Sequence, residues 1–129
     1  METVKILFLV PPNINFRHFT APDQNMRQVI KKDGRAYGNL MTDMPLGLLS
    51  MSGYLKAHSK KNIDIRLIDF NIELNDLDAF THDSYLNYFR EFLDDQKTRF
   101  DPDIIGISSL FTPSYFSLLD KRCMRSILN

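Results

Sequence analysis

The residues of this chain with the most chemical potential follow three short hydrophobic runs. Pro11, Pro12 and Asn13 follow residues 4–10, and Asp69 and Asn71 follow residues 63–67. The third run, residues 104–108, ends at Ser108 and is followed by Ser109, Leu110, Phe111 and Thr112. If the runs are parallel strands, their carboxyl ends meet at one edge of a sheet, where open α/β sheets bind ligands. We therefore expect these residues to line a ligand-binding crevice.

Several kinds of site are excluded by the residues that are missing. No G-x-G-x-x-G or Walker motif occurs. Asp69 stands where dinucleotide folds place the ribose-binding acid, but the chain lacks the glycine-rich turn that would bind a pyrophosphate. A phosphoacceptor site needs clustered carboxylates where Pro11–Asn13 stand. The three histidines have no metal-ligand spacing, and the single Cys123 rules out a disulfide, a multi-cysteine zinc site or an iron–sulfur cluster in this chain. Ser108 and Ser109 have no neighbouring base, so nucleophilic catalysis is not indicated.

Composition indicates a globular domain without a charged partner. The chain has 129 residues, 43% hydrophobic and 25% charged, which suits one folded domain. Sixteen basic residues balance sixteen acidic residues, so no global field attracts nucleic acid or an anionic membrane. The longest apolar run, residues 6–12, is too short to span a bilayer. We expect a cytoplasmic protein that binds neither nucleic acid nor a membrane.

Hydrophobic periodicity predicts an alternation of strands and helices. Residues 4–10, 63–67 and 104–108 read as strands. Helical spacing recurs at 45–58, at about 80–98 and from 114 to the C-terminus, and residues 13–43 read as a long polar loop. This order predicts an α/β fold with a parallel sheet and crossover helices.

The predicted burial of the strands suggests their order in the sheet. Residues 63–67 alternate apolar and polar, as at a sheet edge, whereas the other two strands read as buried on both faces. This pattern favours a flavodoxin-like (Rossmann-like) sheet of order 2-1-3, in which two further strands normally follow. We therefore expect residues 1–129 to be a single, incomplete domain. Its open third strand would pair with a second copy or with a partner chain.

Four segments resemble the N-terminal cobalamin-binding domain of cobalamin-dependent radical SAM enzymes. They are residues 5–13, 45–55, 68–71 and 102–108, in the family's order and spacing. The resemblance adds Leu46 and Gly47 to the candidate site. It also implies a corrinoid held without a protein histidine, with residues 108–110 matching the S-x-L motif against which the nucleotide tail packs. The [4Fe–4S] cluster and SAM would belong to a parent enzyme only, because this chain lacks the three-cysteine motif.

Three functions stay open. The first is a cobalamin-binding module that is not catalytic by itself and comes from a cobalamin-dependent radical SAM enzyme. The second is a non-catalytic α/β interaction module with a vestigial ligand site. The third, a flavin or nucleotide binder, is disfavoured by the absent phosphate loop.

Overall fold

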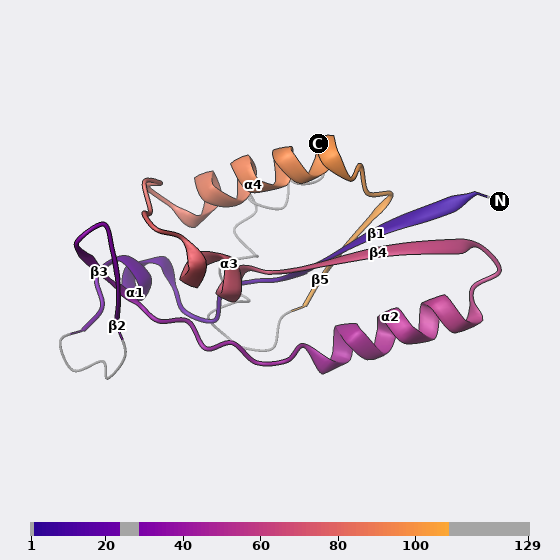
Figure 1. Ribbon diagram of the computed structural model, residues 1–129, viewed down its shortest axis with the longest axis horizontal. Helices are drawn as coiled ribbons and strands as arrows, with labels where there is room; N and C mark the ends of the chain where they lie inside the picture. The colour runs from indigo at the N-terminus through magenta and orange to yellow at the C-terminus, as the bar shows by residue number, and fades with distance from the viewer. Residues whose placement is uncertain (1, 24–28, 109–129) are drawn as a thin grey trace.

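Three layers make up the chain: helix, parallel sheet and helix. The computed structural model describes residues 2–23 and 29–108. Its central sheet has the order β4-β1-β5, with β4 at Asn62–Asp69, β1 at Thr3–Val10 and β5 at Ile104–Ile107, all parallel. Helix α2 (Leu46–His58) covers one face and α4 (Tyr85–Arg99) the other (Figure 1). The expected α/β class, the parallel sheet and the order 2-1-3 of the three predicted strands are confirmed.

Strand β1 is the centre of the sheet and brings the three strand ends level. Its run of β-branched, leucine and aromatic residues ends at Pro11, which cannot donate to a sheet ladder. Val10 stands opposite Asp69 of β4, and Leu9 opposite Ile107 of β5. The residues that follow each strand therefore start at nearly the same height.

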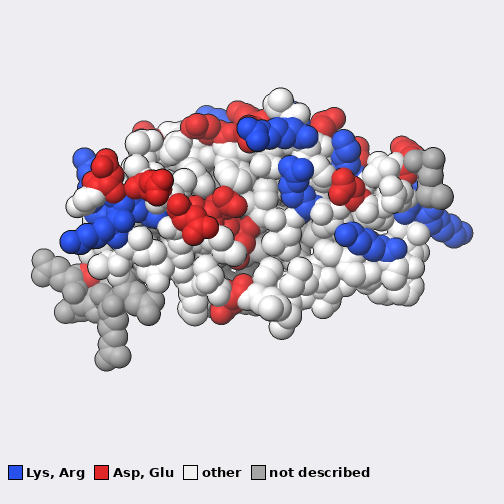
Figure 2. All heavy atoms as spheres, in the orientation of Figure 1, with Lys and Arg blue, Asp and Glu red and all other residues white. Residues whose placement is uncertain are grey.

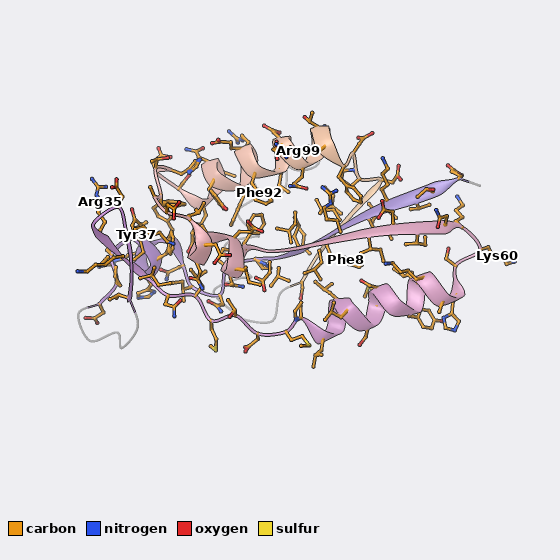
Figure 3. All side chains as sticks on the ribbon, in the orientation of Figure 1. Phe8, Arg35, Tyr37, Lys60, Phe92 and Arg99 are labelled. Carbon is orange, nitrogen blue, oxygen red and sulfur yellow. The ribbon has the colours of Figure 1, made fainter. Side chains whose placement is uncertain are left out.

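Helix α2 packs on the sheet through a narrow apolar stripe. Leu48 is buried against Ile6 and Phe8 of β1, and Leu55 packs on the same cluster. Figure 3 places Phe8 between the sheet and α2. Pro45 occupies the N-cap position and supplies no side-chain hydrogen bond to the helix. The Leu46 N–H donates to the Met44 carbonyl oxygen at 2.8 Å, and among the described residues no side chain caps the N–H groups that follow it in the first turn.

The opposite face of the sheet carries an aromatic core. Leu7 and Leu9 of β1 point to this face, as expected from the alternation of side chains along a strand. They pack with Phe70 and Leu74 of α3 (Phe70–Asp76) and with buried residues of α4. The latter are Tyr85, Tyr88, Phe89 and Leu93. Ser84 caps α4 by accepting a hydrogen bond from the Asn87 backbone N–H.

The segment predicted as a long polar loop, residues 13–43, is ordered over much of its length, so that prediction is wrong. It contains α1 (Phe16–Thr20) and a hairpin of β2 (Val29–Lys32) with β3 (Arg35–Gly38). Asp33 and Gly34, at φ 49° and 75°, form the hairpin turn. An Asp-Gly pair is a recognised signal for such a turn and was overlooked. The apolar residues here are too sparse for a visible period, yet they join the aromatic core.

A buried lysine attaches the hairpin to α3. Lys32 is only 2% exposed, and its Nζ donates to the carbonyl oxygens of Asn75 and Leu77 at 2.6 and 2.7 Å. These carbonyls lie at the carboxyl end of α3, where unpaired acceptors concentrate negative charge. Burial lowers the pKa of Lys32, and the nearby Asp76 and Asp78 carboxylates act in the opposite direction. These two hydrogen bonds fix the hairpin to the carboxyl end of α3.

Two further expectations differ from the structure. The third strand was expected to be buried on both faces, but Ile104 is 51% exposed and the rest of β5 is half-buried, because β5 pairs only with β1 among the described residues. The helix predicted from about residue 80 begins at Tyr85, and α3 was not predicted. The helix expected from 114 onward lies outside the described residues.

In residues 2–23 and 29–108, no helix has the length and apolar character to cross a membrane.

The buried tyrosines predict a loss of stability in alkali. Burial raises the pKa of Tyr85, and burial together with Glu73 raises the pKa of Tyr88 to about 12. An unfolded chain releases both phenol protons near pH 10 while the folded protein keeps them. The free energy of unfolding should therefore fall above about pH 10, by up to about 1.4 kcal/mol per pH unit for each tyrosine.

Urea titrations between pH 10.5 and 12 measure this slope. Lys32, whose pKa is lowered, has the opposite effect only up to the ordinary lysine pKa of 10.5, so this window avoids it. The double substitution Tyr85→Phe/Tyr88→Phe should flatten the slope, and Tyr54→Phe, at an exposed position, should not. An unchanged slope in the double variant would contradict the assignment.

Candidate functional site

A pocket of about 300 Å³ opens where the three parallel strands end. The segments after β1, β4 and β5 form one side, and the amino end of α2 with the segment that leads into it forms the other. This is the position at which open α/β sheets bind ligands. The pocket is the candidate functional site.

Seven residues expected from the sequence line this pocket. They are Pro11, Asn13, Leu46, Gly47, Asp69, Asn71 and Ser108. Pro12 does not line it, because its ring is fully buried beneath. Ser109, Leu110, Phe111 and Thr112 lie outside the described residues.

Five lining residues were not among the expected site residues: Val10, Met41, Asp43, Met44 and Pro45. Val10 and Pro45 adjoin expected residues. Met41 and Asp43 belong to the end of the predicted polar loop, residues 13–43, and Met44 directly follows it. The two methionines were a usable signal, since exposed methionines often mark adaptable binding surfaces.

Asn71 holds the strand ends of β1 and β4 together. Its side chain is buried, with 4% of the residue exposed, and every polar atom has a partner. The Nδ2 group donates to the carbonyl oxygen of Pro11 at 3.1 Å and to Oδ1 of Asp69 at 2.9 Å. Its Oδ1 accepts from the backbone N–H of Asn13 at 2.8 Å. One amide therefore sets the direction in which the chain leaves β1.

Asn13 connects this network to the far wall of the pocket. Its Nδ2 donates to the Met41 carbonyl oxygen at 2.6 Å. Its Oδ1 is buried and has no hydrogen-bond partner within the described part of the chain. A buried acceptor without a donor costs about 1–3 kcal/mol, and such groups in native structures often mark a place for a ligand or a water. Asn13 thus offers a ready acceptor at the pocket wall.

The pocket combines a carboxylate with the positive end of a helix. Asp69 is 6% exposed, and its Oδ1 accepts from the backbone N–H and the Nδ2 of Asn71, both at 2.9 Å. For Oδ2, no hydrogen bond is formed with residues 2–23 or 29–108. Across the pocket, Gly47 is in the first turn of α2, whose N–H groups are uncapped by Pro45. A ligand here meets both acceptors and donors.

The rim of the pocket is apolar. Met41, Met44 and Leu46 are 59, 70 and 65% exposed, which is unusual for three large side chains so close in sequence. Together with Pro11 they give the pocket a mainly hydrophobic mouth around a few polar groups, the usual character of a small-molecule site.

The arrangement can bind a ligand through a few polar groups. The described residues contain no group of three or more His, Cys, Asp or Glu side chains that could hold a metal ion. The pocket lining there includes no histidine, cysteine, lysine or tyrosine that would serve as a base or nucleophile. Asp69 is the only buried ionisable group in it, and its Oδ1 is engaged by Asn71.

Fold and pocket together define an α/β protein with a pocket at the carboxyl edge of a parallel sheet. Comparison with protein-family models, with curated proteins and with solved structures gives no match. The function must therefore be argued from the site.

Proposed function

We propose that this chain is a corrinoid-binding module with a flavodoxin-like sheet, which is not catalytic by itself and derives from a cobalamin-dependent radical SAM enzyme. The main support is the pocket itself. Seven residues, chosen by strand ends and by resemblance to cobalamin-binding domains, line one cavity although they come from four separate segments.

The chemistry of the pocket suits one end of a corrinoid. A corrin is a large disc, mostly apolar and fringed with amides, and it carries a nucleotide tail. A cavity of about 300 Å³ is at the lower limit for a drug-sized ligand, so it suits the tail and not the whole cofactor. The exposed Met41, Met44 and Leu46 then provide an apolar rest for the disc.

Polar groups of the chain have matching partners on such a cofactor. Asn13 Oδ1 and Asp69 accept hydrogen bonds from amide or hydroxyl groups, and the N–H groups at the start of α2 donate to carbonyl or phosphate oxygens. When bound, cobalt would supply the alkyl-transfer or radical chemistry, and the protein's part is to bind, orient and bury the cofactor. The lone cysteine also leads us to assign the chain to the reducing cytoplasm.

Hydroxocobalamin binding tests the proposal. The folded protein should retain the corrinoid through gel filtration and shift its visible spectrum. Gly47→Leu should weaken this binding at least tenfold, because a side chain there meets no protein atom and would project into the open space beside the pocket. Gly53→Leu is the matched control, since it is in the same helix, also meets no protein atom and does not line the pocket.

Two results would count against corrinoid binding. One is a folded wild-type protein, verified by circular dichroism, that elutes without corrinoid at 100 µM ligand. A dissociation constant of that size corresponds to a binding free energy of about −5.5 kcal/mol. The other is equal retention by the Gly47→Leu and Gly53→Leu variants, which would place the bound corrinoid elsewhere.

A second candidate function is an interaction module that pairs with another copy of itself through β5. Among the described strands, β5 has a neighbour on one side only, and its first residue, Ile104, is 51% exposed. An apolar strand edge readily adds a strand from another chain. Multi-angle light scattering should then show a dimer without corrinoid uptake. Ile104→Lys should yield a monomer, whereas Ile72→Lys, an exposed isoleucine on α3, should not.

A further inference from the structure

A second pocket, of about 320 Å³, lies apart from the first. Thr20 from the end of α1, Arg35 and Tyr37 from β3, and residues 80–83 before α4 form its walls. None of these residues lines the pocket at the strand ends. Figure 3 places Arg35 and Tyr37 at the end of the molecule opposite Lys60. Three segments far apart in sequence therefore build a separate cavity.

Aromatic rings make the base of this pocket rigid. Phe80 lies edge-on to Phe19 with 5.1 Å between ring centroids, and Tyr37 is 5.2 Å from Phe19. The Tyr37 hydroxyl donates to the carbonyl oxygen of Phe80 at 3.3 Å. Both pocket aromatics are more than nine-tenths buried, so only a small part of each ring faces the cavity. The result is a fixed apolar surface beneath polar walls.

The walls present one cation and one anion. Arg35 is exposed and forms no ion pair with any residue in 2–23 or 29–108. Asp83 is exposed as well, and its Oδ1 accepts a hydrogen bond from the Asn87 side-chain amide. Carboxylates have about four acceptor positions, so Asp83 retains capacity for a ligand. Arg35 offers a planar group that binds carboxylates through two hydrogen bonds.

His82 is already paired at the edge of this pocket. Its Nε2 lies 2.7 Å from Oε2 of Glu91, and its Nδ1 is buried with no partner among the described residues. The ring extends the aromatic base, 5.5 Å from Phe80 between centroids.

We propose that this second pocket binds a free α-amino acid with an apolar side chain. The carboxylate of such a ligand pairs with Arg35, its ammonium group pairs with Asp83, and its side chain rests on Tyr37 and Phe80. A simple anion is disfavoured because Asp83 and Glu91 would repel it, and a simple cation because Arg35 would repel it. Thr20 and Thr81 also line the wall, and the Thr20 hydroxyl, which donates to the Phe16 carbonyl oxygen at 2.9 Å, can only accept from a ligand.

Titration followed by amide chemical shifts tests this assignment. The probes are L-phenylalanine, 3-phenylpropionate, which lacks the ammonium group, and 2-phenylethylamine, which lacks the carboxylate. We expect L-phenylalanine to shift the resonances of residues 35–37 and 80–83 and to bind at least tenfold more tightly than either analogue. Arg35→Gln and Asp83→Asn should each reduce its affinity at least fivefold.

Arg90→Gln is the matched control, because Arg90 is exposed on α4 and does not line the pocket. All three positions are exposed, so the variants should fold, and circular dichroism checks this. No shift with 20 mM L-phenylalanine would overturn the proposal, as would equal binding of 3-phenylpropionate, which would indicate a plain carboxylate site. Equal loss in the Arg90→Gln variant would overturn it too. None of these results depends on corrinoid binding at the first pocket.

Discussion

Replacing Asn71 with alanine is expected to lower the free energy of unfolding by about 3–5 kcal/mol. Asn71 is only 4% exposed, and its side chain makes three hydrogen bonds, to Pro11, Asp69 and Asn13. Alanine would leave the Pro11 carbonyl oxygen and the Asn13 backbone N–H unpaired, whereas Asp69 Oδ1 would keep the bond from the backbone N–H of residue 71. Each buried unpaired group costs about 1–3 kcal/mol. Relaxation and water entry into the neighbouring pocket would reduce the sum. Urea denaturation followed by circular dichroism measures the loss.

Asn62→Ala provides the control for this experiment. Asn62, the first residue of β4, also makes a side-chain hydrogen bond, to Thr3, but it is exposed. Its replacement should change the free energy of unfolding by no more than about 0.5 kcal/mol. If Asn71→Ala were equally mild, the network would not be what holds the two strand ends together. A folded Asn71→Ala protein should also lose corrinoid retention, because Asn13 would no longer be held at the pocket wall.

Replacing Gly38 with alanine is the second change with a large expected effect, a loss of about 2–3 kcal/mol. A Cβ atom at this position would lie 2.7 Å from the backbone oxygen of His18 and 3.0 Å from Cδ1 of Ile14. The close neighbour is backbone of α1, so it cannot swing aside as a flexible side chain would. Overpacking of this kind typically costs about 1–3 kcal/mol. The strain would separate α1 from β3 and loosen the base of the second pocket.

Gly53→Ala is the matched control, and the expected sign is opposite. No atom lies within 4 Å of a Cβ built at Gly53, which is in the interior of α2. Alanine is more favourable than glycine in a helix by about 0.8–1 kcal/mol, so this variant should be stabilised by close to that amount. Thermal unfolding of both variants in one buffer measures the contrast. Destabilisation by Gly53→Ala would indicate that the helix face is covered in solution.

The exposed face of α2 makes that last outcome informative. Leu46, Leu49, Met51 and Tyr54 are all between 45 and 65% exposed, and Lys56 is the only Lys, Arg, Asp or Glu in the helix. The region over α2 is accordingly mostly white in Figure 2. Apolar character all round a helix explains why its periodicity in the sequence identified a helix but gave a broad choice of buried face.

Much of the fold followed from local patterns. The first strand was marked by its β-branched and aromatic run and by Pro11, the second by alternation, and α2 by the spacing of Leu48, Met51 and Leu55. These signals depend on the chain's own geometry, a period of 2 in strands and 3.6 in helices, so they are legible without the tertiary structure. The second predicted strand was placed at the edge of the sheet because an edge strand is exposed to solvent on one face.

The segment before α2 was less legible for a physical reason. Phe19, Tyr37 and Leu40 are buried, but each belongs to a short element that buries one or two side chains, too few to show a period. Their burial depends on aromatic partners 40 or more residues away, such as Phe80 and Tyr85. The same limit applies to Met41 and Met44, which reach the pocket only because Asn13 and Asn75 hold this segment against the sheet.

By itself, the sequence determined the order of the three parallel strands, the position of a crevice at their carboxyl ends and seven of the residues that line it. The crevice and five of these residues follow from the rule that strand ends share one edge of a sheet. The strand order follows from the predicted burial of the strands, and Leu46 and Gly47 from the family resemblance. Only the tertiary structure decided that Asn71 joins two strand ends, that Asn13 keeps a buried acceptor without a partner, and that Arg35 and Asp83 share a second pocket. Those facts depend on side-chain directions and on contacts between distant segments, which no local pattern encodes.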